Sequence, residues 1–242
     1  MRNIWLNVDT ININNSDMEK LSIGTFINAH KILVTPLVLG LMWFYRNWST
    51  EAFVYLALHG TYSLLWLLKQ TYFPDRRFAE RVPLWIGLGF VFVPLAGYYL
   101  APYLLISQRP TLPPYVFAIV LFLYVTGVFF HYVSDAQKFY ILRERKGLIE
   151  DGLFARTRNP NYLGEILIYL SFAIMSEHWI PFVVLGAWVF GFFARNMLRK
   201  DRSLARHPGF AEYKRRTGLL IPRVFPIAVH TGSRALGQER PV

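Results

Sequence analysis

A carboxylate inside an apolar segment is the most informative chemical group of the sequence. Glu165 follows Asn161 by four residues, so a helix would place both on one face, and Gly164 beside them leaves room for a ligand. Asn159 and Pro160 are residue types that favour a helix N-terminus, whose free N–H groups attract anions. A capped helix flanked by anchoring arginines explains every residue except the carboxylate, which is expensive in hydrocarbon. We therefore predict a cofactor site that includes Asn161, Glu165 and Arg158.

A second candidate is a row of arginines farther along the chain. Arg195, Arg199, Arg202 and Arg206 follow the spacing of a single helical face. Guanidinium groups bind phosphates in bidentate geometry, which predicts cofactor binding by Arg195 and Arg199. The alternative is attachment to anionic lipid headgroups. A tight turn between the two preceding apolar segments would return this row to the side of Glu165.

Polar side chains also interrupt the first two apolar segments. His30 and Lys31 precede the apolar run that begins at Ile32, so they either reach the nearby interface or face the interior. His59 and Tyr62 lie deeper in the second segment. A single buried histidine is more often a hydrogen-bonded structural group than a catalyst, and both interpretations of His59 stay open.

The elements that must position these groups are membrane helices. The 242 residues are 54% apolar and 17% charged, more apolar surface than a compact soluble domain of this length can cover. The formal net charge of +11 alternates with apolar stretches and does not form one basic face, so we expect no nucleic-acid partner. The absence of cysteine excludes thiolate metal sites, and we expect no metal.

Segments of about twenty apolar residues, enough to cross a bilayer, occur six times. The connections divide into one group with 23 Lys and Arg and another with 2, so both termini should be cytoplasmic. We predict an all-α polytopic bundle in a bacterial inner membrane or the endoplasmic reticulum, with oligomeric state open and Pro94 and Pro102 bending the third span. The predicted spans are residues 24–45, 52–69, 83–106, 114–134, 162–177 and 179–198.

The predicted spans group into four parts of the chain. A polar N-terminal segment would be followed by helices on the substrate side, a cofactor-binding membrane domain and a flexible basic tail. These parts are residues 1–23, 24–134, 135–226 and 227–242.

From about Tyr132 to Pro226 the chain resembles the C-terminal domain of membrane steroid 5-alpha-reductases (3-oxo-5-alpha-steroid 4-dehydrogenases). The wider superfamily includes sterol reductases that use NADPH and the isoprenylcysteine and phospholipid methyltransferases that use S-adenosylmethionine. The residues that carry the resemblance are Ser134-Asp135, Gly152-Leu153-Phe154, Asn161-x-Leu163-Gly164-Glu165, Arg195, and the tail from Tyr213 to Ile221-Pro222.

The resemblance implies an NADPH-dependent reductase of a C=C bond in a lipid-soluble, steroid-like or enone substrate. In such an enzyme the substrate's carbonyl oxygen needs preorganised donors, and His30 and Tyr62 are the catalytic candidates. Steroid reductases use an early Glu and a Tyr after Leu-His, whereas this chain has Ala29-His30-Lys31 and Leu58-His59-Gly60. Six spans are also one fewer than their seven. The implied cofactor-binding residues are Asp135, Asn161, Glu165 and Arg195, and more loosely Arg143, Arg145 and Arg199.

Two other functions remain open at this stage. The first is an S-adenosylmethionine-dependent methyltransferase of the isoprenylcysteine or phospholipid type, although its methyl donor is cationic and an arginine row has the wrong charge for it. The second is a non-catalytic membrane protein of the same fold. We expect stabilisation by NADPH and not by S-adenosylmethionine, because arginines favour phosphates.

Overall fold

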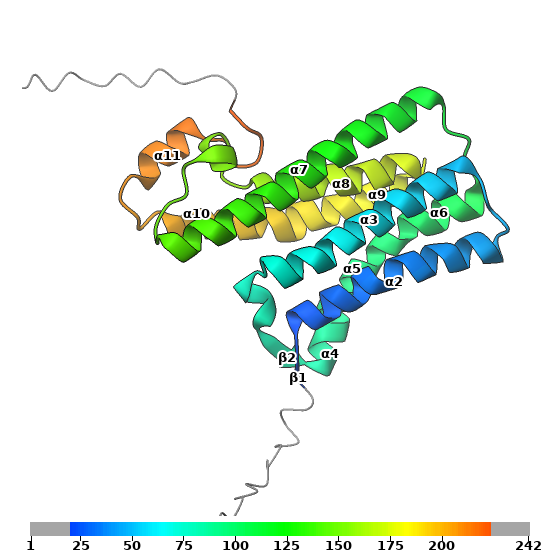
Figure 1. Cartoon of the computed structure of the whole chain (residues 1–242), viewed down its shortest axis with the longest axis horizontal. Coiled ribbons are helices and arrows are strands. Elements are labelled where there is room, and N and C mark those ends of the chain that lie inside the picture. Colours follow the sequence, from blue (N-terminus) through cyan, green and yellow to red (C-terminus); the bar gives the residue numbers. More distant parts are fainter. Residues whose placement is uncertain (1–19, 224–242) are drawn as a thin grey trace, which may run out of the picture.

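The computed structural model describes residues 20–223, and the protein is mostly helical (77%). Long helices run side by side in one bundle, and the short elements gather at one of its ends (Figure 1). The predicted polar start and basic tail lie wholly or mostly outside the described residues.

The first two long helices form an antiparallel pair. α2 (Ile23–Phe44) begins where the Ser22 side chain accepts a hydrogen bond from the Thr25 amide at 3.1 Å, and Ser49 caps α3 (Thr50–Tyr72) in the same way through Ala52. Such caps satisfy amides that a helix start leaves unpaired. β1 (Lys20–Ser22) pairs antiparallel with β2 (Arg81–Pro83), which connects the start of α2 to the third span.

The third span runs from Leu84 to Gln108 and is irregular, as its prolines predicted. Pro94 has no amide hydrogen to donate, and a π-helical segment ends two residues before it, while a 3₁₀ turn lies shortly before Pro102. Its parts are α4 (Leu84–Ile86), η2 (Gly87–Phe92), α5 (Val93–Ala96), η3 (Gly97–Tyr99) and α6 (Leu100–Gln108).

α7 (Pro114–Glu144) and α8 (Pro160–Met175) pack against each other at small residues. A Cβ atom added at Gly164 would lie 2.3 Å from the His131 nitrogen, and one added at Gly127 would lie 2.7 Å from the Gly164 oxygen. Glycine therefore allows the two backbones to approach closely, as at many membrane helix interfaces. α7 continues ten residues past the predicted span end at 134, so Asp135 lies within a helix rather than at its end.

The predicted hairpin between the last two spans is present. α8 ends at Met175, and α9 (Trp179–Gly186) continues through the π-helical η5 (Ala187–Phe193) into α10 (Ala194–Leu204). The 3₁₀ turn η4 (Gly152–Ala155) precedes α8, and α11 (Phe210–Arg216) follows α10. The 3₁₀ turn η1 (Arg76–Ala79) lies between α3 and β2.

The bundle has a membrane protein's surface. Large apolar side chains such as Phe44, Phe90, Phe122 and Phe190 are 69–78% exposed, which only a lipid environment makes favourable. Within residues 20–223, four helices are long and apolar enough to cross a membrane: Ile23–Phe44, Leu84–Gln108, Pro114–Glu144 and Trp179–Leu204. The chain is an integral membrane protein, while six spans and cytoplasmic termini stay predictions.

The two remaining predicted spans are α3 and α8. α8 has only 16 residues, and α3 has a lower mean hydropathy than α2 because it carries polar side chains such as His59 and Tyr62.

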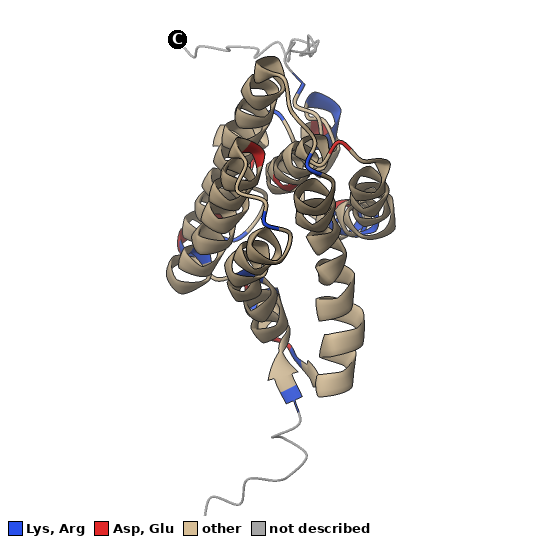
Figure 2. Ribbon diagram, turned by 90° about the vertical axis from the view of Figure 1, so that its right-hand side faces the viewer, with Lys and Arg blue, Asp and Glu red and all other residues tan. Residues whose placement is uncertain are grey.

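Connections 45–49, 109–113 and 176–178 lie at one end of the bundle, and the connections rich in Lys and Arg lie at the other (Figure 1). Figure 2 looks along the helices and shows few charged residues among tan ones.

Candidate functional site

Lys31 points into the bundle and does not reach the interface. Its side chain is 3% exposed, and its Nζ donates a hydrogen bond to the Tyr169 hydroxyl at 2.9 Å. The same nitrogen lies 4.0 Å from the ring centre of Tyr62 and 5.5 Å from that of Trp66. Aromatic faces attract a cation by their quadrupole, so three rings form a cage around this ammonium group.

Several buried polar atoms around this cage have no hydrogen-bond partner among the described residues. They include both ring nitrogens of His30, His59 Nε2, the Tyr62 and Tyr98 hydroxyls, and His131 Nε2. A buried polar atom without a partner costs about 1–3 kcal/mol. A cluster of them therefore marks a place where a polar ligand would be favourable.

The two predicted catalytic residues have different neighbours in this interior. Tyr62 is fully buried beside Lys31, and its hydroxyl has no partner in the described part of the chain. The His30 ring is also fully buried but stacks on Tyr99 with ring centres 4.5 Å apart. His59 is held by a 3.1 Å hydrogen bond between its Nδ1 and the Tyr55 hydroxyl, which agrees with its structural interpretation.

Glu165 lies on the face of α8 that looks toward these groups. Tyr169, the partner of Lys31, is one helical turn farther along the same face, and the Glu165 carboxylate interacts electrostatically with His131 and Lys31. It makes no ion pair with a residue between 20 and 223, so the predicted alternative pair with Arg195 is absent from that part. Asn161 shares this end of α8, and its carbonyl accepts a 3.1 Å hydrogen bond from His131 Nδ1.

A cavity of about 300 Å³ opens at the end of the bundle where the basic connections lie. Asp135 from α7 lines it and pairs with Lys69 from α3 at 2.7 Å, so this predicted cofactor residue belongs to a buried ion pair. Arg143 also lines the cavity and has no carboxylate partner among the described residues. The lining residues are Lys69, Phe73, Pro74, Asp75, Arg76, Arg77, Asp135, Lys138, Phe139, Leu142 and Arg143.

Asp75 organises the outer wall of this cavity. Its carboxylate lies 3.3 Å from both Lys138 Nζ and Arg77 Nη2, and it accepts a hydrogen bond from the Arg77 amide at 3.0 Å. Burial alone would raise the pKa of this carboxyl, but the two cations and the amide outweigh burial and hold the pKa well below its ordinary value. The loop therefore stays charged and attached to α7.

The start of α8 differs from its prediction. Asn159 occupies the capping position, but its side chain is buried and donates to the Leu219 carbonyl at 2.8 Å instead of capping the helix. The tail around Gly218 covers this helix end, since the Arg158 amide donates to the Gly218 carbonyl. The segment around Gly218 therefore covers the helix start at which the sequence predicted free amides.

Arg158, predicted to bind the cofactor, is buried with protein partners. Its guanidinium lies 3.0 Å from Asp201 and donates to the Thr217 carbonyl at 2.8 Å. Lys200 adds a 2.7 Å bond to the Arg158 carbonyl. These contacts fasten α10 and α11 to the start of α8. The sequence interpretation missed Asp201 as the partner, although it was the one acid in a basic helix.

The arginine row is shorter than predicted. Arg195, Arg199 and Arg202 are exposed along α10, but the helix ends at Leu204 and Arg206 lies in the following turn, where it bonds Ser203. Arg145, predicted more loosely, is exposed and pairs with Asp151. None of these five arginines lines the 300 Å³ cavity.

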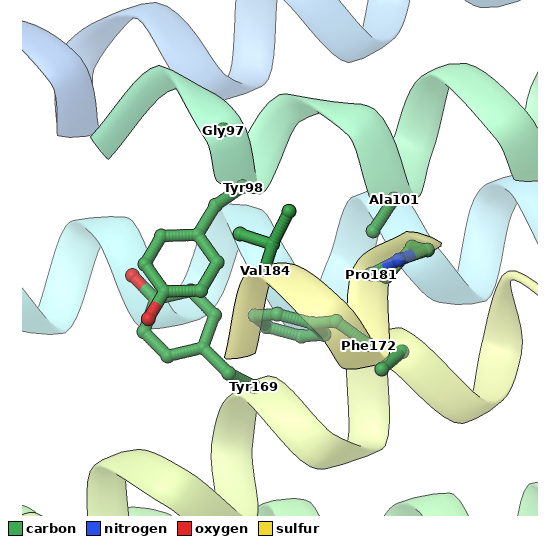
Figure 3. A pocket seen from close by; sticks show the side chains of 8 residues that line it. Gly97, Tyr98, Ala101, Tyr169, Phe172, Pro181 and Val184 are labelled. Atoms are coloured by element: carbon green, nitrogen blue, oxygen red, sulfur yellow. The ribbon is translucent and has the colours of Figure 1, made fainter. Parts of the chain in front are cut away.

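A second, much smaller cavity of about 10 Å³ adjoins Tyr169 and has room for no more than about one water-sized group. Figure 3 shows the rings of Tyr98 and Tyr169 stacked at its edge, with both hydroxyls on the same side. The two ring centres are 3.6 Å apart. Phe172, Val184 and other apolar groups close the remainder, so a lipid needs side chains to move before it can enter.

The fold and these sites define a membrane-embedded helical protein with a basic cavity at one end and a polar interior. A family model described as 3-oxo-5-alpha-steroid 4-dehydrogenase matches residues 80–225, more than half of the chain. The chain belongs to this family, which is a family of oxidoreductases. The match begins farther toward the N-terminus than the resemblance seen in the sequence and includes the irregular third span.

Two curated proteins of Schizosaccharomyces pombe are similar to parts of the chain. Uncharacterized protein C594.04c is 35% identical over 99 residues, which are 38% of this chain and 28% of that protein. Uncharacterized protein C7D4.09c is 40% identical over 42 residues, or 17% and 15% respectively. The chain thus matches less than a third of the length of either relative.

Proposed function

We propose that the protein is an NADPH-dependent reductase of a C=C bond in a lipid-soluble, steroid-like substrate. The observation that carries this proposal is the 300 Å³ cavity, whose size is that of a small-molecule site and whose lining is rich in cations. Membership of an oxidoreductase family supports the same conclusion.

The residues of the cavity fit a phosphate-bearing cofactor. Asp75 pairs with Arg77 and Lys138, and Asp135 pairs with Lys69, which leaves Arg76 and Arg143 without a carboxylate partner in residues 20–223. Arginine groups of this kind bind phosphates, and NADPH supplies a hydride when bound.

The proposal gives the other predicted residues different roles. Arg195 and Arg199 are exposed without ion pairs in the described chain and can approach phosphates from α10. Glu165 and Asn161 would face the cofactor's hydroxyl or amide groups from α8, and Tyr62 and His30 would face the substrate. Arg145, which directly follows α7, would add positive charge to the cofactor site. Arg158 would support the site indirectly, since its donors already bind Asp201 and Thr217.

Thermal unfolding of the purified protein with NADPH, NADH or S-adenosylmethionine tests the proposal. A ligand at 100 times its dissociation constant adds about 2.7 kcal/mol to the folded state. We expect NADPH to raise the melting temperature and S-adenosylmethionine to leave it unchanged. A rise with the methyl donor alone would reject the reductase function.

Variants then locate the phosphates. Arg143→Ala and Arg199→Ala should weaken the binding of NADPH, whereas Arg46→Ala, at the opposite end of the bundle, should not. If Arg199 reads the 2′-phosphate, its loss weakens NADPH more than NADH, and an equal loss for both assigns it to the pyrophosphate. The assignment would be contradicted if neither Arg143→Ala nor Arg199→Ala changed the affinity for NADPH.

A further inference from the structure

Lys31 has more hydrogen-bonding capacity than its surroundings use. An ammonium group carries three N–H donors, and the Tyr169 hydroxyl accepts one of them at 2.9 Å. No carboxylate forms an ion pair with Lys31 among residues 20–223. The rings of Tyr62 and Trp66 attract the charge but accept no conventional hydrogen bond.

Two phenol groups next to Lys31 can donate hydrogen bonds as well. The Tyr62 hydroxyl has no partner in the described chain, and its ring touches the Lys31 ammonium group. The Tyr98 hydroxyl also has no partner there, and it lies beside that of Tyr169, which bonds Lys31 (Figure 3). An ammonium group and neighbouring phenols favour a ligand atom that accepts hydrogen bonds and carries partial negative charge.

We propose that the Lys31 ammonium group binds the carbonyl oxygen of the substrate, with the Tyr62 hydroxyl as second donor. This inference rests on the proposed reductase function. When the β carbon of a conjugated carbonyl compound receives a hydride, the C=C electron pair moves toward the carbonyl and negative charge collects on the oxygen. The α carbon then takes a proton from water, which completes the addition of one hydride and one proton.

Lys31 is suited to this step because it is already desolvated and held in place. The three surrounding rings fix the ammonium group, so it needs no reorganisation as charge develops on the oxygen. A hydrogen bond from a charged donor is worth more in such a dry site than in water. The small cavity beside Tyr169 marks where side chains must move to admit the substrate.

Binding measurements without cofactor test this assignment independently of the reductase proposal. The probes are a 4-en-3-one steroid and the same steroid without the 3-oxo group, and the signal is the fluorescence of Trp66, whose ring lies 5.5 Å from Lys31. Trp66→Phe supplies the control that identifies its share of the signal. The wild-type protein should prefer the ketone about 10- to 100-fold, the range expected for a charge-assisted hydrogen bond.

Lys31→Met should remove most of this preference while leaving the affinity for the deoxo steroid unchanged. Tyr169→Phe is the matched control, because it keeps Lys31 and frees its third donor, so the preference should persist. If the Met variant does not fold, Lys31→Gln replaces it and should keep only a minor part of the preference. A wild-type protein without preference, or a folded Lys31 variant with the full preference, would overturn the inference.

The outcomes separate the two proposals. Failure of NADPH to stabilise the wild-type protein rejects the reductase function, whatever the steroid binding shows. A lost ketone preference in Lys31→Met with intact NADPH stabilisation supports the assignment of Lys31 and leaves the cofactor site unaffected.

Discussion

Two buried charged clusters of this protein are built in opposite ways. Around Arg158 every strong donor has a protein acceptor: Asp201, the Thr217 carbonyl and the Thr217 hydroxyl. Around Lys31 one donor is used, and several neighbouring polar atoms have no partner in residues 20–223. Buried polar groups are normally satisfied, so the first cluster is explained by structure and the second points to a ligand.

The comparison also separates two kinds of sequence signal. Arg158 looked functional because of its neighbours in the chain, but its partner Asp201 is 43 residues away and comes from another helix. Only tertiary packing decides whether an arginine near a helix start is open or occupied.

The largest expected effect is on the satisfied cluster. Arg158→Met leaves Asp201 buried without its partner, which should destabilise the protein by about 3–5 kcal/mol. Chemical unfolding in detergent measures this. Arg145→Ala, which removes the exposed pair with Asp151, is the control and should cost only about 0–1 kcal/mol. Equal losses would contradict the structural role of Arg158.

A smaller effect is expected at the contact that places Glu165 in the bundle. Gly164→Ala puts a Cβ 2.3 Å from the His131 nitrogen and should cost about 1–3 kcal/mol through overpacking. The matched control is Gly186→Ala, whose Cβ meets nothing within 4 Å and should stabilise α9 by roughly 0.5–1 kcal/mol. A neutral Gly164→Ala would show that α7 and α8 are farther apart.

The smallest effect concerns pH. The lowered pKa of Asp75 means that its charged form contributes stability above its unfolded pKa near 3.8, and this contribution is lost as pH falls toward the lower folded pKa. Melting temperatures between pH 6 and 3 should therefore fall more steeply for the wild-type protein than for Asp75→Asn. Parallel curves would show that Asp75 makes no net favourable contact.

The sequence predicted the elements better than the site. Apolar length located all six long helices to within a few residues at most ends. The short connection Ser176–His178 between the last two apolar segments predicted their tight turn. The ten extra residues of α7 were missed because they are polar, so hydropathy ended the segment where the helix continues.

The site residues stay predictions, and their signals differ in physical origin. Glu165 and Tyr62 were singled out because polar groups in apolar segments are rare, and this signal is local. Lys31 remained ambiguous, since the direction of a side chain near a helix start depends on what packs against it. Tyr169 carried a usable signal, its four-residue spacing from Glu165, whereas the Lys69–Asp135 pair joins helices far apart in the chain.

The stability of Lys31→Met, set beside that of Arg158→Met, tests the central claim most directly. Methionine fills the volume of Lys31 and removes a buried charge that has no ion pair among the described residues, so the melting temperature should stay the same or rise. Arg158→Met should lose several kcal/mol in the same assay. If Lys31→Met is destabilised as much as Arg158→Met, Lys31 holds the fold together and is not kept for a ligand.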